Sequence, residues 1–232
     1  MPSPSGRTCA RATICDSSRT SSLSSPSASR SSGSWDALSA VSSAPSRSRV
    51  AARLTTAALI RTVLGETSPG DVVIIDGRSG AGKSTLAREL QRQWSGPRTP
   101  QLVALDELYP GWDGLAAGAE YAVARVLAPR RTGATARWQQ WDWTADRYGP
   151  ERAVGADETI LLEGSGALTA AAAAFATVSI WLDAPSELRK RRALDRDGEA
   201  YRPHWDRWAA QEEDHIARND PRGLATHVVE LV

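Results

Sequence analysis

The chain has 232 residues, of which 24% are charged, and its formal net charge is +1. A near-neutral chain gives no electrostatic reason to expect a polyanionic partner, so nucleic-acid binding by the folded part is not expected. No apolar run approaches the length that crosses a bilayer, so we expect no membrane span and a cytoplasmic location. The sequence leaves the oligomeric state open.

The first 49 residues differ in composition from the rest. They are about one-third serine, with scattered Arg, Ala and Pro and no apolar period. Such a segment buries too little apolar surface to offset its chain entropy, so we predict a disordered tail over residues 1–49 and one folded domain over residues 50–232. Cys9 and Cys15 lie in this tail and define neither a disulfide framework nor a zinc site. The tail is interpreted as a targeting segment, a weak nucleic-acid arm or, the favoured alternative, a non-functional extension.

The domain begins with a predicted amphipathic helix over residues 50–64, followed by a β-branched run over residues 71–76 that predicts a buried strand. The next residues fit the pattern G-x-x-x-x-G-K-[ST], and a helix-forming run follows them. Strand, glycine-rich loop and helix in this order cradle a nucleotide triphosphate. We therefore predict that the nucleotide is bound by Gly77, Ser79, Gly80, Ala81, Gly82, Lys83, Ser84 and Thr85.

Each residue type in this loop has a physical role. Glycines let successive backbone N–H groups converge on one anion, and the helix that starts near Lys83 adds the positive end of its dipole. Lys83 is one of only two lysines in the chain, and it supplies a compact charge for the β- and γ-phosphates. The Ser84 hydroxyl is placed to ligate Mg²⁺. We therefore expect ATP and Mg²⁺, with the choice between ATP and GTP left open.

Beyond a helix that ends near Trp94, strands and helices alternate. Strands are predicted over residues 101–106, 159–163, 177–183 and 226–231, and helices over residues 115–127, 167–175, from 185 onward, and 201–217. This alternation implies an α/β fold whose parallel sheet is covered by helices on both faces. Ligands of such sheets bind at the carboxyl ends of the strands. Asp106 and Glu163 end two of the strands, so we expect them on the same edge as the glycine-rich loop.

Two carboxylates are candidates for the chemistry at this edge. Asp106 is the leading candidate for a general base that orients an acceptor hydroxyl and takes its proton. Its alternative roles are a helix N-cap or a structural ion pair. Glu163 is a candidate to hold a Mg²⁺-bound water or a substrate hydroxyl, and its alternative role is a cap of the following loop.

A row of arginines follows the fourth strand. Arg189, Arg192 and Arg196 recur at i, i+3 and i+7, so they share one face of the predicted helix. Such a row suits the charge that spreads over a phosphoryl group in transfer. The alternative is a solvated basic helix paired with nearby acids.

Aromatic residues follow both Asp106 and the third predicted helix. Tyr109, Trp112 and Trp141 are candidates to stack on a planar substrate, with Asp142 reading a polar edge of that substrate. Ordinary packing in the core or in a lid is an equally good interpretation. The histidines have no mutual spacing that indicates a metal site; they are His204, His215 and His227.

From about residue 50 onward the chain resembles the nucleoside and nucleotide kinase branch of P-loop proteins, and uridine kinases in particular. Besides the loop, residues 105–109 are similar to that family's D-x-[FL]-Y segment, residues 161–164 to its LEG strand end, and residues 183–197 to its lid. The resemblance is closer still to uridine-kinase-like ATP-binding proteins of high-GC bacteria. That group carries D-x-L-Y-P-G-W-D-G-L, W-D-W and R-D-G-E, which stand here at residues 106–115, 141–143 and 196–199.

The resemblance implies a P-loop NTPase fold with a five-stranded parallel sheet in the order 2-3-1-4-5. It implies phosphoryl transfer from ATP to a hydroxyl of a small, nucleoside-like molecule, with the acid of the D-x-[FL]-Y segment, here Asp106, as catalytic base. The family's nucleoside-binding histidine and phenylalanine segment is not recognisable, and residues 141–143 stand near its place. A kinase of another hydroxylated metabolite or antibiotic, and a nucleotide-dependent switch with little turnover, remain alternatives.

Overall fold

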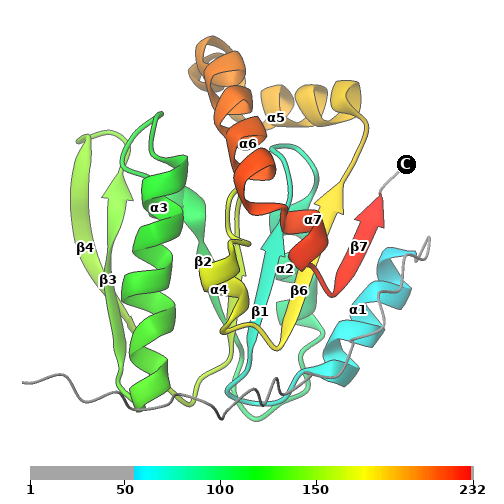
Figure 1. Cartoon of the computed structure of the whole chain (residues 1–232), viewed down its shortest axis with the longest axis vertical. Helices are drawn as coiled ribbons and strands as arrows, with labels where there is room; N and C mark the ends of the chain where they lie inside the picture. The colour runs from blue at the N-terminus through cyan, green and yellow to red at the C-terminus, as the bar shows by residue number, and fades with distance from the viewer. Residues whose placement is uncertain (1–54, 231–232) are drawn as a thin grey trace, which may run out of the picture. The chain divides into compact units, whose positions relative to one another are not determined.

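The computed structural model describes residues 55–230, so the tail predicted over residues 1–49 and the first residues of the domain lie outside the described part. Within that part, five parallel strands form the main sheet in the order β2-β5-β1-β6-β7 (Figure 1). They are β1 (Val72–Asp76), β2 (Gln101–Ala104), β5 (Ile160–Glu163), β6 (Val178–Asp183) and β7 (His227–Glu230). Counted along the chain these strands run 2-3-1-4-5, which confirms the predicted fold class and strand order.

The register of the central strands explains why acidic residues meet at one edge. β1 lies between β5 and β6, and Ile75 of β1 is opposite Glu163 of β5. Glu163 is also opposite Ala104, the last residue of β2. Because parallel strands point their carboxyl ends the same way, Asp76, Glu163 and the segment after Ala104 share an edge.

Alternating residues of the strands fill two separate cores. Val72 and Ile74 of β1 face one core, whereas Val73 and Ile75 face the other. The first core is closed by α3 (Leu115–Ala122), α4 (Ala170–Ala173) and α6 (Trp205–Asn219), and the second by α1 (Thr56–Glu66) and α2 (Lys83–Arg92). Figure 1 shows α2 behind the sheet and α4 in front of it. Helices therefore cover both faces, as predicted.

The remaining helical segments include short turns that were not predicted as helices from the sequence. They are η1 (Leu105–Glu107), a π-helical turn η2 (Val123–Leu127), η3 (Ala128–Thr132), α5 (Ser186–Tyr201), η4 (Arg202–His204) and α7 (Pro221–Leu224). The helix predicted over residues 201–217 begins only at Trp205, because Tyr201 ends α5 and Pro203 lies in the turn between the two helices. No helix of the described part is long and apolar enough to span a bilayer.

A β-hairpin was not predicted. It consists of β3 (Ala136–Asp142) and β4 (Arg147–Val154), which form their own antiparallel sheet beside α3 (Figure 1). Its alternating pattern is short, because only Ala136 and Trp138 are buried in β3 and the register shifts between Gln139 and Trp141. β4 contains a glycine and a proline, both unfavourable in strands, and its first seven residues are at least partly exposed.

Candidate functional site

The glycine loop, residues 77–82, joins the end of β1 to the start of α2. Gly77 and Gly80 have φ angles of 151° and 77°, which other residues rarely adopt. A Cβ atom at Gly77 would overlap the carbonyl oxygen of Leu182, and one at Gly80 would overlap that of Arg189. The loop therefore lies directly against the end of β6 and the start of α5, and both positions require glycine.

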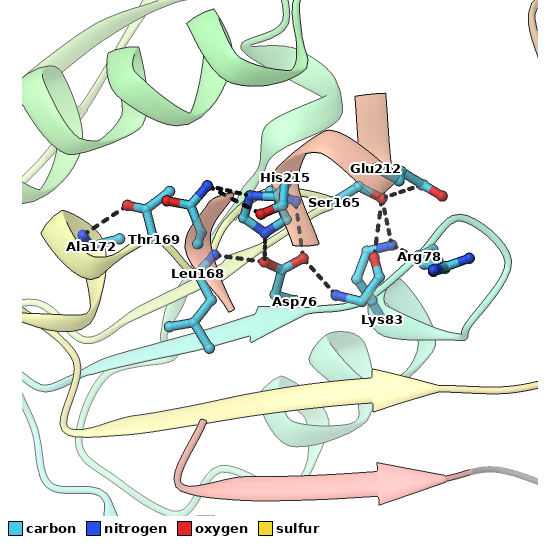
Figure 2. A network of polar contacts seen from close by, with 12 residues as sticks. Asp76, Arg78, Lys83, Ser165, Leu168, Thr169, Ala172, Glu212 and His215 are labelled. Atoms are coloured by element: carbon cyan, nitrogen blue, oxygen red, sulfur yellow. Dashed lines mark hydrogen bonds and ion pairs between the residues drawn. The ribbon is translucent and has the colours of Figure 1, made fainter. Parts of the chain in front are cut away.

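Lys83 opens α2 and turns its side chain back into the glycine loop. Its side chain is buried, and its Nζ donates to the carbonyl oxygen of Arg78 at 3.1 Å and to the hydroxyl of Ser165 at 3.2 Å (Figure 2). The unsatisfied N–H groups of the first turn of α2 start at the same place. A buried ammonium beside a helix N-terminus makes this end of the loop strongly attractive to an anion.

Asp106 and Glu163, here called the acid pair, lie at the ends of neighbouring strands. Asp106 is exposed on η1, directly after β2, and Glu163 is buried at the end of β5. Burial raises the pKa of the Glu163 carboxyl, and the charge of Asp106 raises it further. The ammonium of Lys83 and a side-chain hydrogen bond with Ser84 act in the opposite direction on this pKa. Asp106, Lys83 and Ser84 are therefore all close enough to Glu163 to affect its ionisation.

Asp76, at the end of β1, holds the glycine loop in place through hydrogen bonds. This residue was not identified from the sequence. Its buried carboxylate accepts backbone N–H bonds from Gly77 at 2.6 Å, Gly166 at 2.9 Å and Leu168 at 2.8 Å (Figure 2). Nε2 of His215, on α6, lies 2.9 Å from Oδ2 of Asp76. Asp76 therefore ties the loops after β1 and β5 to α6.

The three predicted lid arginines differ in their surroundings. Arg189 is buried, and its guanidinium donates to the carbonyl oxygens of Ala184 at 3.0 Å and Ser79 at 3.3 Å, so it anchors α5 to the glycine loop. Arg192 is exposed and lines a cavity of about 440 Å³ together with Gly82 and Thr85.

Arg196, further along α5, interacts electrostatically with both members of the acid pair. Its guanidinium is paired with Asp197, and this hydrogen bond raises the pKa of Arg196; the charge of Asp106 acts in the same direction. The row therefore contributes one anchoring arginine and two arginines whose side chains are open to solvent.

An aromatic cluster lies beside Asp106. It consists of Trp112, Trp143, Tyr201, His204 and Trp208. The ring of Trp112 stacks on His204 with centroids 4.1 Å apart and planes at 11°, and its centroid lies 5.0 Å from that of Trp143. The indole N–H of Trp143 donates to the backbone oxygen of Asp106 at 2.8 Å, although 40% of Trp143 is exposed. The tip of the hairpin is thus attached to the segment that carries the candidate base.

The other predicted acceptor residues have structural contacts. Tyr109 is fully buried and donates its hydroxyl to the backbone oxygen of Ser165 at 2.7 Å. Trp141 packs edge-on against Tyr148, with ring centroids 5.0 Å apart. Oδ1 of Asp142 accepts the N–H groups of the two turn residues at 144 and 145, each at 2.9 Å, and so closes the hairpin.

The five-stranded parallel sheet, with a glycine loop between its first strand and the next helix, is the architecture of the P-loop NTPase fold. Among solved structures, a possible uridine kinase from Bacillus stearothermophilus is similar, with a TM-score of 0.55 and 19% identity over 75% of this chain and 96% of that chain. A protein described as a fructose transport system kinase from Silicibacter sp. TM1040 has a TM-score of 0.45 and 21% identity over 75% and 98% of the two chains. No protein-family model and no curated protein matches the sequence. The first likeness establishes the fold.

Proposed function

We propose that the chain is an ATP- and Mg²⁺-dependent kinase that phosphorylates a hydroxyl of a small, nucleoside-like molecule. The observation that carries this proposal is the acid pair beside the glycine loop. Asp106 is exposed at the carboxyl end of the sheet, whereas Glu163 is buried and interacts with Lys83 and Ser84. Two carboxylates in different surroundings at the end of a phosphate-binding loop suit two different roles.

In the proposed reaction, Lys83 and the backbone N–H groups of the glycine loop hold the β- and γ-phosphates. Asp106 accepts the proton of the acceptor hydroxyl, whose oxygen attacks the γ-phosphorus. The bond from that phosphorus to the β–γ bridging oxygen breaks, and the electron pair leaves with ADP. Arg192 and Arg196 close over the transferred group and keep water out.

Ser84 and Glu163 would hold Mg²⁺. Their side chains share a hydrogen bond, so a hydroxyl oxygen and a carboxylate oxygen meet at the start of α2. Oxygen ligands of this kind fit Mg²⁺, which keeps several waters and binds through one or two protein groups plus phosphate. When bound, the ion supplies positive charge to the transferring phosphoryl group.

The aromatic cluster supports a planar acceptor. Trp143 is exposed yet anchored to the backbone of Asp106, so a ring stacked on it would lie close to the candidate base. Trp112 packs against Trp143, and the buried Tyr109 supports the aromatic cluster from inside the core.

The test is an acceptor screen. The full chain is supplied with ATP and Mg²⁺ and with single nucleosides, sugars or other hydroxylated metabolites, and ADP is followed by a coupled assay. Acceptor-stimulated ADP release, with a phosphorylated product seen by mass spectrometry, supports the proposal. Slow hydrolysis that no acceptor stimulates contradicts it and favours a nucleotide-dependent switch.

A further inference from the structure

Glu212, on α6, places a buried carboxylate against the glycine loop. Its Oε1 accepts the backbone N–H of Ser79 at 2.7 Å, the hydroxyl of Ser165 at 2.9 Å and the indole N–H of Trp208 at 3.1 Å (Figure 2). Only 4% of Glu212 is exposed. Three donors on one oxygen, one of them an N–H of the loop, form the kind of cradle that binds an oxyanion.

A chain of hydrogen bonds connects this carboxylate to the ammonium of Lys83. The Ser165 hydroxyl lies between them, 3.2 Å from Nζ of Lys83 and 2.9 Å from Oε1 of Glu212. Within residues 55–230, no lysine or arginine forms a direct ion pair with Glu212. A buried carboxylate without such a partner is costly unless other groups compensate its charge. Here part of the compensation comes from the Ser79 N–H of the glycine loop and, through Ser165, from Lys83, which are groups proposed to hold phosphate.

We infer that Glu212 is an internal anion of the glycine loop, which a nucleotide polyphosphate must displace. This inference rests on the proposed function, because it requires that a polyphosphate binds at Lys83. An incoming phosphate and the Glu212 carboxylate carry the same sign of charge and compete for the Ser79 N–H and, through Ser165, for Lys83. Binding therefore shifts the chain toward a state in which α6 is released from the loop.

Neighbouring contacts show how release of Glu212 would propagate. The hydroxyl of Tyr201 donates to Oγ of Ser79 at 3.0 Å, and Arg78 of the loop pairs with Glu213 at 2.7 Å. Tyr201 and Trp208 also belong to the aromatic cluster. The movement that admits a polyphosphate would thus also rearrange the aromatic cluster beside Asp106.

The first experiment compares Glu212→Gln with the unmodified full chain. Glutamine keeps an oxygen that accepts the Ser79 and Trp208 bonds but removes the charge. The matched control is Asp214→Asn, which removes an exposed charge from the same helix. Dissociation constants of tripolyphosphate, MgADP and MgATP are measured by calorimetry. We expect Glu212→Gln to bind tripolyphosphate and MgATP about tenfold more tightly, within the usual range of coupling between competing sites, and Asp214→Asn to change little.

The second experiment needs no variant. Hydrogen exchange of α6 is compared with and without MgATP in the unmodified chain, and faster exchange at the loop-facing part of α6 is expected. Unchanged or weaker binding by Glu212→Gln, or unchanged exchange of α6 at saturating MgATP, overturns the inference and leaves the kinase proposal intact. Failure of both chains to bind tripolyphosphate and nucleotide overturns the inference and the proposed function together.

Discussion

The glycine loop and the aromatic cluster lie at the same edge of the sheet but are built in different ways. The loop depends on backbone conformation within one short segment, since Gly77 and Gly80 have no space for a side chain. The cluster depends on side chains from three segments that are far apart in the chain, represented by Trp112, Trp143 and Trp208. The proposed nucleotide site is therefore determined by one short stretch of sequence. The proposed acceptor site forms only when distant segments come together in the folded chain.

The largest expected effect comes from removing the charge of the glycine loop. Lys83→Ala should lower acceptor-dependent ADP formation by more than about 10³-fold, because no other side chain can supply an ammonium between the loop and Ser165. Circular dichroism and thermal unfolding should remain close to those of the unmodified chain. A folded Lys83→Ala variant with full activity would refute the role given to the loop.

Removal of the candidate base should have the next largest effect. Asp106→Asn should slow turnover by about 10²- to 10⁴-fold, because the amide cannot take the acceptor proton, while MgATP binding persists. The matched control is Glu107→Gln on the same turn, an exposed residue whose carboxylate accepts from Gln140. Steady-state kinetics and calorimetry measure the two effects, and equal losses in both variants would count against a specific role of Asp106.

The backbone argument for the loop is tested by stability. Gly77→Ala should lower the free energy of unfolding by about 3 kcal/mol, since its Cβ meets a fixed carbonyl oxygen and its φ is unfavourable. Gly133 also has a positive φ, 71°, but no atom lies within 4 Å of a Cβ built there, so Gly133→Ala should cost only about 1 kcal/mol. Urea unfolding of both variants gives the comparison, and similar costs would show that the close approach at Gly77 does not matter.

The acceptor side is tested at the hairpin tip. Trp143→Ala should raise the KM of the acceptor about tenfold with a smaller change in the KM of ATP, because stacking of a base on an aromatic ring contributes about 1–3 kcal/mol. Trp141→Ala is the control, since Trp141 packs within the hairpin against Tyr148. A larger acceptor effect at Trp141 than at Trp143 would reverse the assignment made from the structure.

The smallest expected effect concerns the pH dependence of stability. Burial raises the pKa of Glu163 above its ordinary value of 4.5, so the folded chain retains this proton to higher pH than the unfolded chain. The Glu163 contribution to stability therefore falls as the pH rises from about 4.5 through the raised pKa, and is constant above it. In Glu163→Gln this contribution is absent, so the stability difference should move in favour of the variant across that window. Urea unfolding at a series of pH values tests this, and parallel profiles would contradict it.

Local patterns predicted the parts of the fold that local forces determine. The run Val-Val-Ile-Ile-Asp before the glycine loop is buried at all five positions, and the strand and helix on either side of the loop appear where they were expected. The hairpin was missed because a register shift interrupts its alternation near Gln139, and because Gly149 and Pro150 disfavour a strand.

The sequence predicted the positions of residues at strand ends, and it missed partners that come from far along the chain. His215 contacts Asp76, 139 residues away in the sequence, and Glu212 contacts Ser79, 133 residues away. No local sequence pattern predicts such contacts. The assignment of Trp141 and Asp142 to the acceptor remains a prediction. In the structure it is Trp143 that contacts Asp106, and which of three consecutive side chains does so depends on the pairing of β3 with β4.

The hairpin also has a practical consequence for protein engineering. β3 and β4 pair with each other and share no backbone ladder with the strands of the main sheet within residues 55–230. Ala136, Trp138 and Val154 pack into the core and should be kept, whereas the exposed positions of the two strands can be varied without shifting the registers of the main sheet. On the proposed function, a library confined to these exposed positions would vary the surroundings of the acceptor while leaving the glycine loop unchanged.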